Sequence, residues 1–114
     1  MLRSKIHRAT VTETRLDYEG SLGVDAALLE AADVLPNERV QFVNLSNGAR
    51  AETYIIAEPR GSGTICLNGA AARLGEPGDK IIVFAFCLLD DAEARAHKPT
   101  FVYVDDQNRV TKKT

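Results

Sequence analysis

The sequence predicts a mainly β protein, a small closed barrel with short connecting helices. Many short runs rich in β-branched and aromatic residues are separated by turn residues, and the helix-prone stretches between them are brief. The run from Ile81 to Leu89 is almost entirely apolar, which is typical of a strand buried on both faces, in a barrel wall or at a subunit contact. Together these patterns favour a small closed barrel.

The first third of the chain predicts a strand, a turn and a helix. Residues 5–14 are rich in Thr and favour a strand, and residues 17–20 supply turn chemistry. Ser21 therefore lies at a corner between strand and loop. Residues 25–32 predict a short helix that Asp25 caps and that ends before Pro36.

A hairpin is predicted in the middle of the chain. Residues 39–45 and 50–56 are strand-like, and between them stands Asn47-Gly48, the strongest short hairpin signal. Because side chains alternate along a strand, Arg50, Glu52 and Tyr54 are expected on one face of the second strand. Arg50 and Tyr54 can therefore share a site.

The remaining segments are expected to be short. They are a strand at 64–67, a helical turn at 70–73, the apolar strand at 81–89, a charged helical turn at 90–96, a strand at 100–104 and a frayed tail at Lys112-Lys113. The small residues around the turn at 70–73 would let the backbone pass close to another group.

Length and charge limit the function. A chain of 114 residues is one domain with a modest core, so a site shared between subunits of an oligomer is more natural than a deep cleft. With 14 Lys and Arg against 16 Asp and Glu, the chain lacks the basic surface of a nucleic-acid binder. It has neither a membrane-length apolar stretch nor an apolar signal segment, so no membrane partner and a cytoplasmic location are predicted.

The two cysteines are expected to be buried small hydrophobes. Cys66 and Cys87 lie in apolar runs without a Cys-x-x-Cys pair, and His7 and His97 are the only histidines. This pattern indicates neither a disulfide framework nor a zinc site. No metal is expected, and His97 is interpreted as structural.

The dipeptide Gly20-Ser21 is the most informative feature of the chain, because it can be interpreted as a self-cleavage site. The Ser21 hydroxyl would attack the preceding carbonyl, cut the backbone and leave an electrophilic ketone at position 21. Glycine tolerates the strained approach that such a step needs. The alternative is an ordinary turn, since Gly and Ser are both turn residues.

Seven short motifs along the chain carry a resemblance. They are Lys5-Ile6-His7-Arg8-Ala9-Thr10-Val11-Thr12, Tyr18-Glu19-Gly20-Ser21, Asn47-Gly48-Ala49-Arg50, Thr53-Tyr54, Asn68-Gly69-Ala70-Ala71-Ala72, Pro77-Gly78-Asp79 and Ala96-His97-Lys98-Pro99. In this order they closely resemble the aspartate 1-decarboxylase family over nearly the whole chain. Ala51, Glu52 and the tail after Val104 depart from the family pattern, which affects packing more than chemistry.

The resemblance implies both a fold and an activity. The fold would be a six-stranded double-psi β-barrel in a homotetramer, with sites between neighbouring subunits. Cleavage would give residues 1–20 (the β chain) and 21–114 (the α chain), the latter starting with a covalent pyruvoyl cofactor made from Ser21. The reaction would convert L-aspartate to β-alanine and carbon dioxide in pantothenate and coenzyme A biosynthesis. A maturation factor could assist the cleavage.

The resemblance also assigns roles to residues, each with a structural alternative. Thr53 would assist cleavage, or be an ordinary strand residue. Arg50 would grip a substrate carboxylate with its planar fork, or form a surface ion pair. Tyr54 would donate a proton, or pack in the barrel. The remaining expected substrate contacts are Lys5, His7, Asn68, Gly69, Ala70 and Ala71, with Tyr18 shaping the pocket. Their alternatives are a solvated strand edge for Lys5, a structural histidine for His7 and an Asx turn for Asn68.

Two other functions stay open at this level. The chain could be an uncleaved barrel that acts as a binding or adaptor module, in which case Ser21 remains a serine. It could also be a pyruvoyl decarboxylase of another acidic amino acid. Pyridoxal-phosphate chemistry is disfavoured, because the chain is too short for the large folds that usually hold that cofactor.

Overall fold

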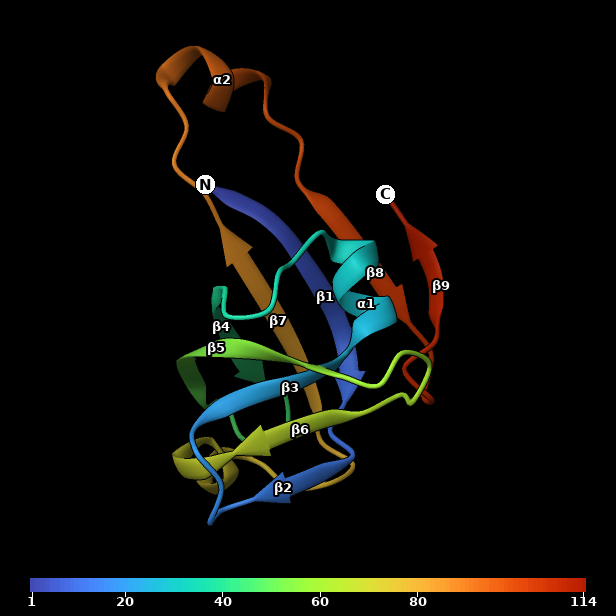
Figure 1. Cartoon of the computed structure of the whole chain (residues 1–114). Coiled ribbons are helices and arrows are strands. Elements are labelled where there is room, and N and C mark those ends of the chain that lie inside the picture. The colour runs from blue at the N-terminus through green and yellow to red at the C-terminus, as the bar shows by residue number, and fades with distance from the viewer.

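Nine strands form one continuous hydrogen-bonded ladder in the computed structural model, which describes residues 1–114 (Figure 1). The elements in chain order are β1 Leu2–Thr10, β2 Glu13–Arg15, β3 Ser21–Asp25, α1 Ala26–Ala32, β4 Arg39–Asn44, β5 Arg50–Glu58, β6 Ile65–Asn68, the 3-10 helix η1 Gly69–Leu74, β7 Lys80–Phe86, α2 Asp91–Ala96, β8 Thr100–Val104 and β9 Val110–Lys113. The prediction of a mainly β protein with short helices is confirmed.

The strand order is β2-β6-β3-β5-β4-β7-β1-β8-β9. The pairs β1 with β8, β2 with β6 and β3 with β5 are parallel, and the other pairs are antiparallel. The structure has nine strands in all, and the end strands β2 and β9 do not pair with each other. Closure into a double-psi barrel stays a prediction.

Strand β7 contributes one of its two faces to the hydrophobic core. Ile81, Val83 and Ala85 are buried within a cluster of 18 apolar residues, whereas Phe84 is half-buried and Phe86 is exposed. The single chain thus buries one face of this strand rather than both. The strand also ends at Phe86, three residues earlier than predicted, because the chain leaves the sheet there and rises into the arm that carries α2 (Figure 1).

The predicted hairpin and first helix are confirmed. β4 and β5 pair from Arg39 with Tyr54 to Val43 with Arg50 around the Asn47-Gly48 turn, where Gly48 has a φ of 73°. Asp25 caps α1, and its carboxylate accepts a 2.8 Å hydrogen bond from the backbone N–H of Ala27. Left-handed Asp33 (φ 55°) ends the helix.

Two sequence-based boundaries were wrong. The strand predicted over 5–14 is divided into β1 and β2, because the Thr12 hydroxyl bonds the backbone of Ile65 and turns the chain toward β6. The tail predicted to fray forms β9, where Lys113 pairs with Val102. Antiparallel pairing with β8 orders these basic residues although their side chains stay exposed.

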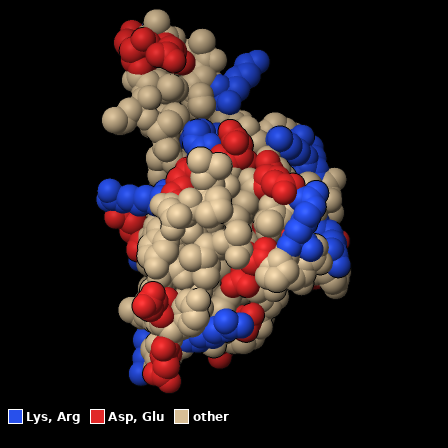
Figure 2. All heavy atoms as spheres, in the orientation of Figure 1, with Lys and Arg blue, Asp and Glu red and all other residues tan.

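The surface carries charges of both signs. On the face in Figure 2, basic and acidic side chains are interspersed without a large area of one sign. No helix is long and apolar enough to span a bilayer.

Candidate active site

Ser21 is the first residue of β3, directly after the turn that contains Gly20. Its side chain is buried, with 1% of the residue exposed, and it faces Asn68 on the antiparallel strand β6. The Asn68 side chain donates a 2.9 Å hydrogen bond from Nδ2 to the Ser21 Oγ. The strand pairing and this hydrogen bond together fix the position of the Ser21 hydroxyl.

A hollow of about 460 Å³ opens onto this serine. Its lining residues are Gly20, Ser21, Ala51, Glu52, Thr53, Asn68, Ala70, Ala71 and Leu74. The structure thus brings together six of the residues singled out from the sequence, namely Gly20, Ser21, Thr53, Asn68, Ala70 and Ala71. The small side chains on η1 leave space for a ligand the size of an amino acid.

Gly69 lets η1 approach the Gly20 turn. A Cβ at Gly69 would lie 2.9 Å from the Gly20 Cα and 3.0 Å from the Tyr18 carbonyl oxygen, and its φ of 65° favours glycine. The close backbone passage expected from the small residues is therefore present, and the group approached is the Gly20 turn. Tyr18 itself is half-exposed and does not line the hollow.

Lys5 and His7 lie elsewhere, on the outer face of β1. Lys5 pairs with Phe101 and His7 with Tyr103 on β8, so the two side chains share one face as predicted. The Lys5 Nζ is 5.0 Å from the Phe101 ring centroid, and the His7 ring meets Tyr103 edge-on at 5.6 Å. Burial lowers the pKa of His7, and the positive charges of Lys5 and Arg8 lower it further. These surroundings favour the neutral imidazole, and its Nδ1 has no hydrogen-bond partner.

Arg50 lies on the same outer surface, at the start of β5. Its guanidinium donates a 3.2 Å hydrogen bond to the Gln41 side chain and stands 5.8 Å from the Phe84 ring centroid. Arg50 forms no salt bridge within the chain, whereas the neighbouring Glu52 pairs with Arg39 at 2.6 Å. The guanidinium is therefore free to bind an external carboxylate.

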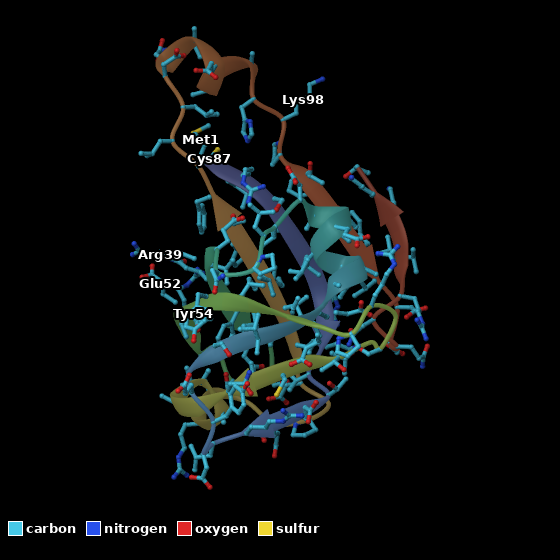
Figure 3. The ribbon with its side chains drawn as sticks, viewed as in Figure 1. Met1, Arg39, Glu52, Tyr54, Cys87 and Lys98 are labelled. Carbon is cyan, nitrogen blue, oxygen red and sulfur yellow. The ribbon has the colours of Figure 1, made fainter.

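Tyr54 is exposed on the same strand, and the exposure of Arg50, Glu52 and Tyr54 confirms the predicted alternation. Figure 3 shows Tyr54 near the Arg39 and Glu52 side chains, and Arg39 is the residue that pairs with Tyr54 across β4 and β5. Neither Arg50 nor Tyr54 lines the hollow at Ser21. Within one chain the predicted residues thus form two groups, the Ser21 hollow and an outer-face group that consists of Lys5, His7, Arg50 and Tyr54.

The similarity to known proteins extends over the residues of both groups. The family model described as aspartate decarboxylase matches residues 1–111. The chain belongs to the aspartate decarboxylase family. It is 63% identical over 110 residues to the aspartate 1-decarboxylase of Heliobacterium modesticaldum, which covers 96% of this chain and 83% of that protein. It is 60% identical over 110 residues to the aspartate 1-decarboxylase of Pelotomaculum thermopropionicum, with the same coverage of 96% and 83%. The aspartate 1-decarboxylase of Caldicellulosiruptor saccharolyticus is 59% identical over 112 residues, covering 98% of this chain and 88% of that protein.

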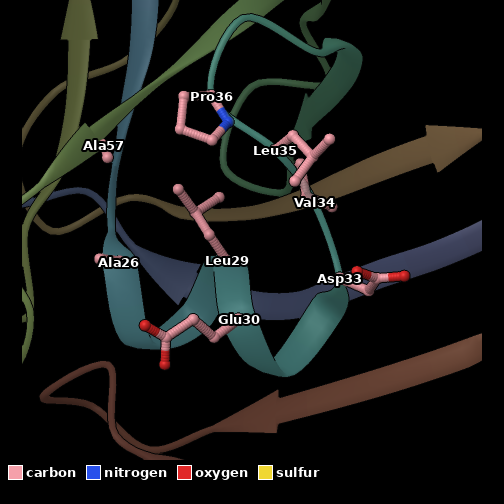
Figure 4. Close-up of a pocket in the computed structure, with 8 residues that line it drawn as sticks. All are labelled: Ala26, Leu29, Glu30, Asp33, Val34, Leu35, Pro36 and Ala57. Carbon is pink, nitrogen blue, oxygen red and sulfur yellow. The ribbon is translucent and has the colours of Figure 1, made fainter.

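A second hollow of about 420 Å³ lies beside α1 and is not part of this site (Figure 4). Leu29, Val34, Leu35 and Pro36 give it apolar walls, and Glu30 and Asp33 lie at its edge. The two hollows of this aspartate decarboxylase family member have similar volumes, so chemistry distinguishes them. Only the one at Ser21 contains a buried hydroxyl and a side-chain amide.

Two residues at the site were missed in the sequence. Glu52, interpreted as a packing difference from the aspartate decarboxylase family, lines the Ser21 hollow. Cys66, expected only as a buried hydrophobe, is indeed fully buried, but its Sγ also lies 3.1 Å from the Asn68 Oδ1. The sequence did offer a signal for this contact, because residues two apart on one strand, as Cys66 and Asn68 are, lie on the same face. Cys87 is only half-buried, because it lies at the base of the arm, and both thiols are free.

Proposed function

We propose that this chain makes its own pyruvoyl cofactor at Ser21 and uses it to decarboxylate L-aspartate to β-alanine in pantothenate biosynthesis. Membership of the aspartate decarboxylase family makes the chain a carboxy-lyase. The observation that carries the proposal is the buried Ser21 hydroxyl, held by Asn68 beside the Gly20–Ser21 bond and open to a hollow with small walls. An adaptor would have no need of this arrangement.

The local geometry fits a cofactor made from Ser21. The Ser21 Oγ would attack the Gly20 carbonyl carbon, and the amide bond would give way to an ester. Elimination would release residues 1–20 with a new carboxylate, and water would then replace the nitrogen at position 21 with loss of ammonia. A Cβ at Gly20 would meet no atom within 4 Å, so there is room for the turn to move during attack.

Thr53 and Asn68 are the side chains best placed to assist that cleavage. Both line the hollow, and Asn68 already contacts the attacking oxygen. We assign to Thr53 the activation of the serine, and to the Asn68 amide the positioning of the Ser21 oxygen. Holding the attacking oxygen in a fixed position lowers the entropic part of the barrier to attack.

Once formed, the pyruvoyl ketone would bind the substrate amine covalently and withdraw the electrons left by carbon dioxide. The protein must hold the two substrate carboxylates apart and return a proton to carbon. Arg50 suits one carboxylate because it has no partner carboxylate of its own. Lys5 suits the other, and Tyr54 suits proton donation because its phenol carries an O–H donor.

The separation of the two groups supports an oligomeric site. None of Lys5, His7, Arg50 and Tyr54 lines the Ser21 hollow of its own chain, so we propose that these four side chains reach the Ser21 hollow of a neighbouring subunit. The apolar side chains between them, Phe84 and the exposed Phe86, suit burial in such a contact. A homotetramer with shared sites is the assembly proposed, in the cytoplasm, with or without a maturation factor.

Covalent trapping tests this proposal. Purified protein is incubated with aspartate and borohydride, digested and mapped by mass spectrometry. We expect an aspartate-derived adduct on residue 21 and on no other residue. Glutamate in a parallel reaction gives little adduct if aspartate is the substrate, and gives the larger yield if the chain acts on another acidic amino acid. Absence of any adduct on cleaved protein contradicts the proposed chemistry.

A further inference from the structure

We infer that Cys66 is a positioning residue, whose thiol holds the Asn68 side-chain amide with its NH₂ end toward Ser21. This inference rests on the proposed function of the Ser21 hollow. The Cys66 Sγ lies 3.1 Å from the Asn68 Oδ1, and the Asn68 Nδ2 lies 2.9 Å from the Ser21 Oγ. The three side chains thus form one chain of hydrogen bonds that ends at the attacking oxygen.

The chain of hydrogen bonds lies entirely inside the protein. Cys66 is fully buried, and Asn68 and Ser21 are each 1% exposed. Cys66 and Asn68 are two residues apart on β6 and therefore face the same way, while Asn68 pairs directly with Ser21. A buried polar group takes its orientation from its hydrogen-bond partners.

Orientation matters because the two ends of an amide have opposite roles. The NH₂ group donates hydrogen bonds and the oxygen accepts them, whereas the Ser21 hydroxyl can do either. Ser21 alone therefore accepts both orientations of Asn68. The Cys66 thiol selects one of these two orientations. Its S–H group is a donor, so it favours the orientation in which the Asn68 amide oxygen faces Cys66. The NH₂ group then faces residue 21, where it donates to the Ser21 oxygen and holds that oxygen in place for attack.

The surroundings keep Cys66 protonated, which the donor role requires. Burial raises the pKa of the thiol to about 11, and the Glu13 carboxylate contributes in the same direction. The Glu58 carboxylate also raises the pKa, and Arg15 opposes these effects. Glu13 pairs with Cys66 on β2, and the Glu58 side chain covers Gly23, which pairs with Cys66 from β3.

A matched pair of variants tests the inference. Cys66→Ser keeps a donor at this position and Cys66→Ala removes it, although the two side chains have nearly the same size. The readouts are the rate of Gly20–Ser21 cleavage, followed by intact mass, and the kcat and KM for aspartate of fully cleaved protein. We expect Cys66→Ala to slow cleavage by roughly tenfold to a hundredfold, the scale of a misplaced positioning group, with Cys66→Ser close to wild type.

Three controls keep the test decisive. Cys66→Val, which fills the space without a donor, should be as slow as Cys66→Ala. Thermal unfolding checks that all variants fold. The ¹⁵N resonance of the Asn68 side-chain amide, which does not depend on activity, should move in Cys66→Ala and Cys66→Val but not in Cys66→Ser.

The other outcomes contradict either the positioning role of Cys66 or the proposed function of the hollow. Cleavage at the wild-type rate in both Cys66→Ala and Cys66→Val overturns the positioning role. Equal slowing in Cys66→Ser and Cys66→Ala also overturns it, since packing rather than hydrogen bonding would then matter. A wild-type protein that never cleaves counts against the proposed function itself, and the Asn68 resonance alone then decides whether Cys66 orients the amide.

Discussion

Asn68 and Ser21 stand directly opposite each other on antiparallel strands, and the Asn68 amide donates a 2.9 Å hydrogen bond to the serine hydroxyl. Both residues are nearly inaccessible to solvent. The Ser21 oxygen, the proposed nucleophile of the self-cleavage, therefore already accepts a hydrogen bond from the Asn68 amide before the reaction begins.

Replacing this donor by an acceptor should impair cleavage. In Asn68→Asp a carboxylate of similar shape faces the serine oxygen and removes the N–H donor. The misplacement of a reacting group costs up to about 10²-fold in rate, and the Asn68 amide is the side chain that holds the serine oxygen in place. Time-resolved intact mass of freshly purified Asn68→Asp measures the effect. Cleavage at the wild-type rate would show that the amide is dispensable.

Gly69 should not tolerate a side chain, because alanine there would clash with the backbone of the Gly20 turn at 2.9 Å. Gly48 is the matched control, since its φ of 73° is similar but a Cβ there meets nothing within 4 Å. We expect Gly48→Ala to lose about 1 kcal/mol of unfolding free energy from strain alone, and Gly69→Ala to lose more and to cleave slowly. Chemical denaturation measures the stabilities. Equal effects in both variants would argue against the close approach.

Asp25 should stabilise the fold in a pH-dependent way. Burial alone would raise the pKa of its carboxyl, but hydrogen bonds from the backbone N–H groups of Ala27, Gly63 and Gly61 outweigh it and lower the pKa below the usual 3.8. Because the folded-state pKa is depressed, the stabilisation is present above pH 3.8 and is lost as the pH falls through the folded-state value. Asp25→Asn should lower the free energy of unfolding by roughly 2 to 3 kcal/mol near pH 7. The asparagine NH₂ group is a donor, so one of these backbone N–H groups loses its acceptor.

The matched control for Asp25 is Asp90, which caps α2 on the exposed arm. Asp90→Asn should change the unfolding free energy by less than about 0.5 kcal/mol, because asparagine caps helices nearly as well. Denaturant titrations between pH 3 and pH 7 test both variants. If the difference in unfolding free energy between wild type and Asp25→Asn does not decrease as the pH is lowered to 3, the stabilisation does not come from the Asp25 carboxylate.

Arg50 should determine substrate affinity. Lysine at this position keeps the positive charge but loses the planar fork, so Arg50→Lys should raise the KM for aspartate by about tenfold, as a lost bidentate contact does. Arg39→Lys on the neighbouring strand is the control, because Arg39 already pairs with Glu52. Initial rates over a range of aspartate concentrations distinguish the two. An unchanged KM in Arg50→Lys would remove Arg50 from the site.

Local chemistry predicted most of the elements. The Asn47-Gly48 turn and the Asp25 cap each act over a few residues, so the hairpin and α1 follow from the sequence. Pairing between distant segments is not visible in this way. The tail around Lys112 resembles a frayed end until β8 lies beside it, and the break near Thr12 depends on Ile65.

The candidate site shows the same division. Alternation along β5 placed Arg50 and Tyr54 on one face, but it could not show that the Ser21 hollow lies apart from them within one chain. Cys66 and Asn68 share a strand face by their spacing alone. Their connection to Ser21 depends on the register between β3 and β6, which no local pattern encodes.

Intact mass of the purified protein under denaturing conditions tests the proposed self-cleavage most directly. We predict two fragments, residues 1–20 and 21–114, with the larger lighter than a serine-terminated fragment by one ammonia. Ser21→Ala should remain a single chain. A wild-type chain that stays whole after prolonged warming and after incubation with cell extract would contradict a cofactor made from Ser21 and favour the adaptor function.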